Sequence, residues 1–281
     1  MEGIQVSIDS HLQASSVYGP VRSWRVGSSL GIDLLLVNSI CSFNCSYCQL
    51  GNIQVRTLTR SLFVPTAKVM ADLERSAWRE ASVVTFSGSG EPTLALNLGE
   101  TTRLIKDYTG LPTLVLTNGT LLNMSDVRKE LGLADRVFVK LDAASEATFQ
   151  RVNRPVEGIT LASILRGLRR FRDEYSGYLG LQTMFVHSSL DRIEELAALV
   201  REIRPEEVQV NTPTRPYPSE WHLASRGSHE GVSYPARPVK PVSAEYLLRV
   251  GEELRRLCPG VLVQDVAKAH EMLGRQGRCL S

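Results

Sequence analysis

The 281-residue sequence has no long hydrophobic run and almost no net charge. No apolar stretch approaches the roughly 18 to 20 residues that a membrane-spanning helix needs, and the first residues lack the basic-then-apolar pattern of a signal peptide. The formal net charge is only +2, so the chain offers no strong positive field to a polyanion. These absences predict a cytoplasmic protein with no membrane partner, and they do not favour nucleic acid as a partner.

Cysteine is scarce, with five residues in the chain, and three of the five lie between positions 41 and 48. This distribution does not suit a disulfide framework and is typical of a reducing compartment. The chain also lacks the Gly-x-Gly-x-x-Gly fingerprint of a dinucleotide-binding sheet. The clustered cysteines are therefore the feature around which a functional site is expected.

The clustered cysteines, Cys41, Cys45 and Cys48, have the spacing CxxxCxxC and follow the apolar run 32–37. One loop can close three such thiolates around a single inorganic centre. An iron–sulfur cube is usually held by four thiolates and a structural zinc by four ligands, so three local cysteines leave one metal position open for chemistry. The alternative is a zinc clip completed by a distant histidine or by Cys258, although CxxxCxxC lacks the paired spacing that zinc sites favour.

At these residues the sequence resembles the radical S-adenosylmethionine (SAM) superfamily, whose signature is CxxxCxΦC with an aromatic Φ, here Tyr47. The stretch 18–33 is similar to the GPVxSxRxGxSLGxD opening of a group related to the tRNA wyosine-base synthases, of iron–sulfur oxidoreductase type. The resemblance implies a [4Fe–4S] cluster on Cys41, Cys45 and Cys48, whose fourth iron is chelated by SAM. It implies an enzyme, a lyase or an oxidoreductase, in which one electron cleaves SAM to a 5′-deoxyadenosyl radical that takes hydrogen from a substrate. A flavodoxin- or ferredoxin-type partner would supply the electron.

Strand-like and helix-like segments alternate between residues 31 and 211 in about six βα units, which is the pattern of a parallel sheet covered by helices. Together with the resemblance, this predicts an α/β fold, an open partial (β/α)6 barrel of TIM type with a C-terminal extension. We expect a single domain over 1–281, with an N-terminal arm at 1–30 and the barrel core at 31–211. A substrate-facing loop and the C-terminal extension, including a helix at 244–257, would occupy 212–281.

Polar residues end the apolar runs, and in a (β/α) barrel the carboxyl ends of the strands form the active site. The turn Gly88–Glu91 is similar to the GGE motif of the family, with Ser-Gly-Glu in place of Gly-Gly-Glu, and its glycines would let backbone carbonyls approach a methionine ammonium. By the same resemblance, Asn118 and Asp142 are candidates for the methionine carboxylate and the ribose hydroxyls, although a turn or capping role suits both equally. The expected cofactor-binding set is Tyr47, Gly88, Ser89, Gly90, Glu91, Asn118, Asp142, Gln182 and Asn211.

Residues 212–241 hold six prolines and no periodic pattern. A long loop of this kind in a compact domain is either functional or disordered, and its aromatic residues argue against disorder. We expect it to close over the mouth of the barrel, with a packed surface loop as the alternative. Its aromatic faces and donors would suit a flat, heteroatom-rich substrate such as a nucleobase derivative. The expected substrate contacts are Lys140, Arg215, Trp221 and His222.

The sequence favours a radical SAM enzyme acting on a small molecule or a nucleobase-type substrate. A wyosine-type tRNA enzyme is a second reading, but no cysteines precede Cys41 to hold the additional cluster of those relatives. A third is an activase that plants a glycyl radical on a partner protein. A non-enzymatic electron carrier would leave the expected SAM-site residues without a role. The sequence assigns no residue as the catalytic hydrogen donor.

Overall fold

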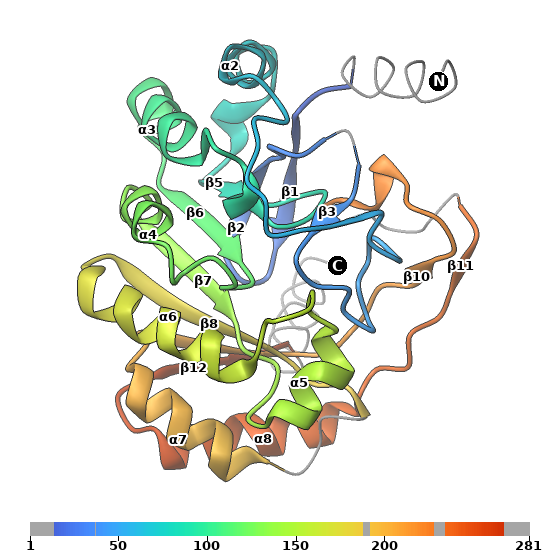
Figure 1. Cartoon of the computed structure of the whole chain (residues 1–281), viewed down its shortest axis with the longest axis vertical. Coiled ribbons are helices and arrows are strands. Elements are labelled where there is room, and N and C mark those ends of the chain that lie inside the picture. The colour runs from blue at the N-terminus through green and yellow to red at the C-terminus, as the bar shows by residue number, and fades with distance from the viewer. Residues whose placement is uncertain (1–13, 37, 188–191, 228–233, 267–281) are drawn as a thin grey trace, which may run out of the picture.

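The computed structural model describes residues 14–36, 38–187, 192–227 and 234–266. The strands of its main sheet are β1 (Val17–Ser23), β2 (Gly27–Ile32), β5 (Val83–Phe86), β6 (Thr113–Thr117), β7 (Arg136–Lys140), β8 (Tyr178–Met184), β9 (Glu207–Asn211) and β12 (Leu262–Asp265). They lie in the order β1-β2-β5-β6-β7-β8-β9-β12 and curl through 193° as a half-barrel (Figure 1). All neighbours from β2 onward are parallel, and only β1 is antiparallel. The predicted α/β fold, an open partial barrel, is confirmed.

Helices follow the strands and cover the outer face of the sheet (Figure 1). They are α2 (Thr66–Glu74), α3 (Leu98–Thr109), α4 (Ser125–Leu131), α5 (Glu146–Asn153), α6 (Leu161–Glu174), α7 (Ile193–Ile203) and α8 (Ala244–Leu257), with 3-10 turns η1 (Trp78–Glu80), η2 (Pro92–Leu94) and η4 (Leu223–Ser225). The helix predicted at 244–257 is therefore present. Among the described residues, no helix is both long and apolar enough to cross a membrane.

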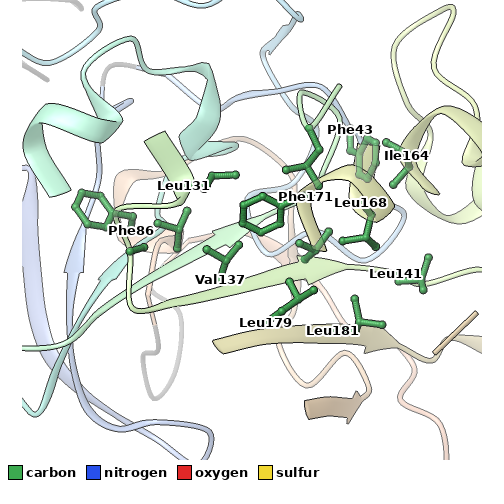
Figure 2. Close-up of a cluster of buried hydrophobic side chains, with 14 of the residues drawn as sticks. Phe43, Phe86, Leu131, Val137, Leu141, Ile164, Leu168, Phe171, Leu179 and Leu181 are labelled. Carbon is green, nitrogen blue, oxygen red and sulfur yellow. The ribbon is translucent and has the colours of Figure 1, made fainter. Parts of the chain in front are cut away.

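Alternation along the strands separates the core from the inner face of the half-barrel. Val137 of β7 and Leu179 of β8 are fully buried on the side of the sheet that packs against Phe171 of α6 (Figure 2). The side chains of Phe138 and Lys140 in β7 and of Gln182 in β8 point to the opposite face of the sheet. They line a cavity inside the half-barrel. The same period-2 pattern thus builds the core and presents polar groups to the interior. The core residues drawn in Figure 2 include Phe43, Phe86, Leu131, Val137, Leu141, Ile164, Leu168, Phe171, Leu179 and Leu181.

The sheet begins earlier in the chain than the sequence predicts. Residues 17–32, expected as an arm and a turn-rich approach, form the antiparallel hairpin β1–β2. Residues 33–36 of the apolar run that starts at Ile32 are not a strand, because Asp33 accepts hydrogen bonds from the amides of Leu35 (3.0 Å) and Leu36 (3.1 Å) and so turns the chain after β2. The side chains of Leu35 and Leu36 are buried in the core, although their backbone forms no strand.

The sheet also extends beyond the expected barrel core, since β12 adds a strand parallel to β9. The small pairs β3 (Ile40–Cys41) with β4 (Val55–Arg56) and β10 (Tyr217–Pro218) with β11 (Ala236–Arg237) stand apart from the main sheet. Parts of the expected arm and extension, residues 1–13, 228–233 and 267–281, lie outside the described residues.

Candidate functional site

A cavity of about 500 Å³ occupies the inner face of the half-barrel. The three cysteines Cys41, Cys45 and Cys48 form part of its wall. Other predicted site residues that line it are Tyr47, Gly88, Gly90, Glu91, Asn118, Lys140, Gln182, Asn211 and Arg215. The predicted residues Ser89, Asp142, Trp221 and His222 are not among those that line it. The carboxyl ends of the strands therefore bring most of the predicted residues together around one space.

Residues 41–48, which we call the cluster loop, are held by backbone hydrogen bonds on both sides. Before the loop, the Ile40 amide donates to Ser89 (2.8 Å) and the Ile40 carbonyl accepts from Glu91 (3.0 Å). Within the loop, the amides of Asn44 and Ser46 donate to carbonyls at the end of α5, at 3.0 and 2.8 Å. The loop is thus clamped between the Gly88–Glu91 turn and α5, a helix that the sequence patterns did not predict.

The three thiols are in an environment that opposes a free negative charge. Burial raises the pKa of all three, that of Cys41 well above its ordinary value and that of Cys45 to about 12. Repulsion from Glu91 raises the pKa of Cys41 further, and repulsion from Cys48 does so for Cys45. Lys140 acts in the opposite direction on Cys45 and Cys48. A cationic inorganic centre would relieve this repulsion, because metal ligands bind as thiolates and lose their protons to the solvent.

The arrangement suits a cluster better than a single zinc ion. Among the described residues, no group of three or more Cys, His, Asp or Glu side chains converges to hold a metal ion. Zinc requires its sulfurs about 2.3 Å away and hence close to one another, whereas a cube distributes its cysteines over separate irons. Cys258, the alternative fourth ligand, lies in the outer helix layer and donates to the Ala197 carbonyl of α7 at 3.6 Å. Within residues 14–36, 38–187, 192–227 and 234–266, the zinc clip therefore has no support from the geometry.

Two buried asparagines donate hydrogen bonds to cluster-loop sulfurs. The Asn118 amide nitrogen lies 3.5 Å from Cys41 Sγ and 2.8 Å from Ser42 Oγ, and the Asn153 amide nitrogen lies 3.6 Å from Cys45 Sγ. The Asn118 side-chain oxygen accepts from Thr120, so its amide direction is fixed. Hydrogen bonds of this kind orient ligands and tune the centre that they hold. Asn153 was missed by the sequence reasoning, because nothing local distinguishes it at the end of an unpredicted helix.

The Gly88–Glu91 turn needs its glycines for close backbone approach. Gly90 has φ +151°, and a Cβ there would lie 1.7 Å from the carbonyl oxygen of Ile40, next to Cys41. Glu91 is buried, and its carboxylate accepts hydrogen bonds from Thr93, from the Thr117 hydroxyl and from the backbone amide of Asn118. Burial raises the pKa of Glu91 in spite of these donors. The turn therefore fixes the cluster loop to β6, and its contact with SAM stays a prediction.

Asp142 connects the cluster loop to the ends of β7 and β8. The Tyr47 hydroxyl donates to one carboxylate oxygen, which also accepts from Asn153 at 2.6 Å. The other oxygen accepts from the Met184 amide at 2.8 Å and lies 3.5 Å from the Lys140 ammonium. Desolvation, and then repulsion from Asp142, raise the pKa of Tyr47 well above its ordinary value. Asp142 is not among the residues that line the cavity, and its contact with a ribose stays a prediction.

The described part of the 212–241 loop packs against the chain that follows the cysteines. Gln49 donates to the Ser225 carbonyl at 2.9 Å, and the Tyr217 hydroxyl donates to Asn52 at 2.7 Å. Residues 212–215 and 227 line the cavity, and closure of this loop over the substrate stays a prediction. His222, however, stacks on Tyr234 with ring centroids 4.5 Å apart, away from the lining. Residues 228–233 of this loop lie outside the described residues.

Comparison with known proteins agrees with this geometry. Residues 35–209 match the family model described as the radical SAM superfamily. The chain is 50% identical over 231 residues to the UPF0026 protein slr1464 of Synechocystis sp., which covers 81% of this chain and 86% of that protein. It is 33% identical over 213 residues to the UPF0026 protein MJ1312 of Methanocaldococcus jannaschii, covering 73% of this chain and 65% of that protein.

A solved structure of TYW1 with a lysine-pyruvate adduct bound has a similar fold. The TM-score is 0.58 at 16% identity, over 89% of this chain and 81% of that one. The family match includes the cluster loop and the parallel strands from β5 to β8. This chain belongs to the radical SAM superfamily.

Proposed function

We propose that the protein is a radical SAM enzyme that binds a [4Fe–4S] cluster on Cys41, Cys45 and Cys48 and acts on a small-molecule or nucleobase-type substrate. The observation that carries the proposal is the placement of these three cysteines, on one clamped loop, in the wall of a cavity of about 500 Å³. Superfamily membership supports an enzyme. Within the part of the chain that the structure describes, the other cysteine, Cys258, is buried against α7, so the donor set of three thiols suits a cube with an open iron.

When bound, the cluster and SAM would supply a 5′-deoxyadenosyl radical that takes a hydrogen atom from the substrate. The residues of this chain hold and enclose these partners. Asn118 and Asn153 orient the cysteine sulfurs, and the turn at Gly90 sets the entry to the cluster loop. Gln182, within β8, and Asn211, at the end of the neighbouring β9, line the cavity and are our candidates for contacts with SAM. Residues 212–215 cover the space and would limit the access of water to a reactive intermediate.

The lining favours a polar heterocyclic substrate. The Gln182 side chain donates to Gln209 at 2.9 Å, and both line the cavity beside Phe138 and Met184. Side-chain amides offer both donors and acceptors, and an aromatic face can stack on a flat ring. Tyr217 and Ser225 pack against Asn52 and Gln49, in the chain that follows the cysteines. This packing leaves less room at the cavity for a protein target, so it favours a small substrate. The electron would come from a flavodoxin- or ferredoxin-type donor in a reducing, cytoplasmic setting.

The test is anaerobic reconstitution with iron and sulfide, followed by incubation with SAM and a one-electron reductant. We expect about four irons per chain and the release of 5′-deoxyadenosine. Cys41→Ala, Cys45→Ala and Cys48→Ala should each lose the iron and the SAM cleavage. Cys258→Ala is the matched control, because its thiol is buried between α7 and α8, so it should keep the iron. Full iron content in Cys45→Ala, or zinc in place of iron in the wild type, would contradict the proposal.

A further inference from the structure

Three exposed arginines lie next to the cluster loop. Arg56, Arg154 and Arg237 come from three separate segments, namely β4, the residue after α5, and β11. None of the three is among the described residues that line the cavity. They therefore belong to the surface around the cluster loop, and not to the space that we assign to SAM and the substrate.

Two of these arginines are directly connected to cysteines of the cluster loop. Arg56 is the strand partner of Cys41 in the ladder β3–β4. Arg154 directly follows Asn153, whose side-chain amide nitrogen lies 3.6 Å from Cys45 Sγ. The Arg56 guanidinium also donates to the Arg154 carbonyl at 3.1 Å, which joins the two segments. The surface thus carries a cation beside each of these two cysteines.

Arg237 has the corresponding place beside Cys48. Its guanidinium carbon stands 4.3 Å from the centre of the Tyr217 ring. Burial, and then the charge of Cys48, raise the pKa of Tyr217, whereas Arg237 and Arg154 lower it. Tyr217 is therefore close to one cysteine and to two of the arginines. Because the Tyr217 hydroxyl donates to Asn52 at 2.7 Å, the pair β10–β11 is held against the chain that follows the cysteines (Figure 1).

The charge of the three arginines is not balanced by carboxylates among the described residues, whose ion pairs involve other cations. Arg56 donates instead to the carbonyls of Arg154 and Pro155, the latter at 2.7 Å. The chain has no Asp or Glu between positions 34 and 71. Carbonyl oxygens fix the direction of a guanidinium without neutralising it, so this surface is locally positive although the chain as a whole is nearly neutral.

We propose that this face, formed by Arg56, Arg154, Arg237 and the neighbouring Val55, binds an acidic one-electron carrier protein that reduces the cluster. The proposal rests on the proposed function, because it is the reductive cleavage of SAM that needs an electron. Electron transfer slows steeply with distance, and each arginine stands about one residue away from a cluster-loop cysteine. The flavin or iron–sulfur group of the carrier loses one electron and the cluster gains it, so no bond or proton has to move at the interface.

The composition of the face suits a transient partner. Val55 is 39% exposed beside Arg56 and offers an apolar contact, and interfaces between electron-transfer partners are small. Opposite charges on the two proteins would steer the encounter and orient the carrier toward the cysteines. A nucleic acid is the other polyanion that arginines bind, but three cations grouped around one loop do not follow a phosphate backbone over its length.

Binding of the oxidised carrier can be measured by biolayer interferometry on the anaerobically reconstituted protein. The probes are an acidic flavodoxin and an acidic [2Fe–2S] ferredoxin, each at low and at high ionic strength. At low ionic strength, we expect Arg154→Glu and Arg237→Glu each to slow association by about threefold or more. High ionic strength should reduce this difference, because salt screens exposed charges. Arg166→Glu, an exposed change on α6, is the matched control and should keep the wild-type rate.

Stopped-flow absorbance of the cluster separates docking from folding. Arg154→Glu and Arg237→Glu should slow reduction of the cluster by photoreduced flavodoxin, but not by the methyl viologen radical, a small cation that needs no docking face. Slower reduction by both reductants would indicate a structural role and overturn the proposal. Association of neither carrier, or rates in both variants equal to that of Arg166→Glu, would also overturn it.

A tRNA transcript is the competing probe. If it binds through these arginines while neither carrier binds, the face is a nucleic-acid surface and the proposal is wrong. Missing iron, or no 5′-deoxyadenosine with viologen as the reductant, is a failure of the proposed function. Iron and viologen-driven cleavage that are intact without carrier binding are a failure of the docking face alone, so the two failures are distinguishable.

Discussion

The side-chain amide of Asn153 donates a hydrogen bond to the sulfur of Cys45, with 3.6 Å between nitrogen and sulfur. The same nitrogen donates to the Asp142 carboxylate at 2.6 Å, which fixes the direction of the amide. Asn153 is buried at the last position of α5. An N–H group directed at a ligand sulfur stabilises added negative charge, so it favours the reduced state of a bound cluster.

We expect Asn153→Leu to make the midpoint potential of the reconstituted cluster more negative by about 20–60 mV, since one hydrogen bond contributes about 0.5–1.5 kcal/mol. An EPR-monitored redox titration measures this directly, without reference to turnover. Gln150→Leu is the control, because Gln150 lies on the exposed face of the same helix. An unchanged or less negative potential in Asn153→Leu would show that the amide does not act on the cluster.

Gly90→Ala should lower both the thermal stability and the iron content of the protein. The added Cβ would lie 1.7 Å from the Ile40 carbonyl oxygen, so the backbone that leads into Cys41 must move. Gly110→Ala is the matched control, with φ +66° at the end of α3 and nothing within 4 Å of its added Cβ. It should cost only about 1–2 kcal/mol of backbone strain and keep the iron. Normal iron loading in Gly90→Ala would contradict the clamp between the turn and the cluster loop.

Asp72 should stabilise the fold in a pH-dependent way. Although burial opposes its ionisation, Lys68, the Ser16 amide and hydroxyl, and Arg75 lower the pKa of Asp72 from 3.8 to about 2. The stabilisation is therefore present above the unfolded-state pKa and is lost as the pH falls through about 2. Asp72→Asn should cost about 2 kcal/mol at neutral pH, and this difference should shrink below pH 4.

Chemical denaturation of the two proteins across this pH range measures the difference. Asp107→Asn, an exposed change on α3, serves as the control and should have little effect at any pH. A difference between Asp72→Asn and the wild type that stays constant down to about pH 2 would argue that the ionised carboxylate is not what stabilises the fold.

Arg226 holds the segment 212–227 against the hairpin β1–β2 and the residues that flank it. Its guanidinium lies 3.3 Å from Asp33, donates to the Ser15 carbonyl at 2.8 Å and stands 4.9 Å from the centre of the Tyr18 ring. Arg226→Ala should leave Asp33 buried without this cation and loosen residues 212–227. We expect faster chymotrypsin cleavage in that segment, whereas Arg166→Ala should cleave at the wild-type rate. Equal rates in both variants would show that the ion pair does not hold this segment.

The local signals of the sequence determined most of the fold. The alternation of apolar residues in β7 and β8 and the apolar face of α6 are periodic over a few residues, so they predicted these elements without long-range information. The spacing of Cys41, Cys45 and Cys48 is equally local and indicated a three-thiolate site. The hairpin β1–β2 was missed, because glycines and a proline indicate turns and hide a strand that is stabilised by its partner.

Only the tertiary structure decided how the site is supported and charged. Asn153 reaches Cys45 across 108 positions of sequence. Asp142 accepts a hydrogen bond from Tyr47 and is not among the residues that line the cavity, although its position after a strand suggested that it would be. Arg25 and Arg215 line the same cavity because the curl of the sheet brings the β1–β2 hairpin and the segment after β9 to one space. The direction of a side chain in a loop is set by its tertiary contacts. Those contacts join segments that are far apart in the chain, so no local sequence pattern predicts them.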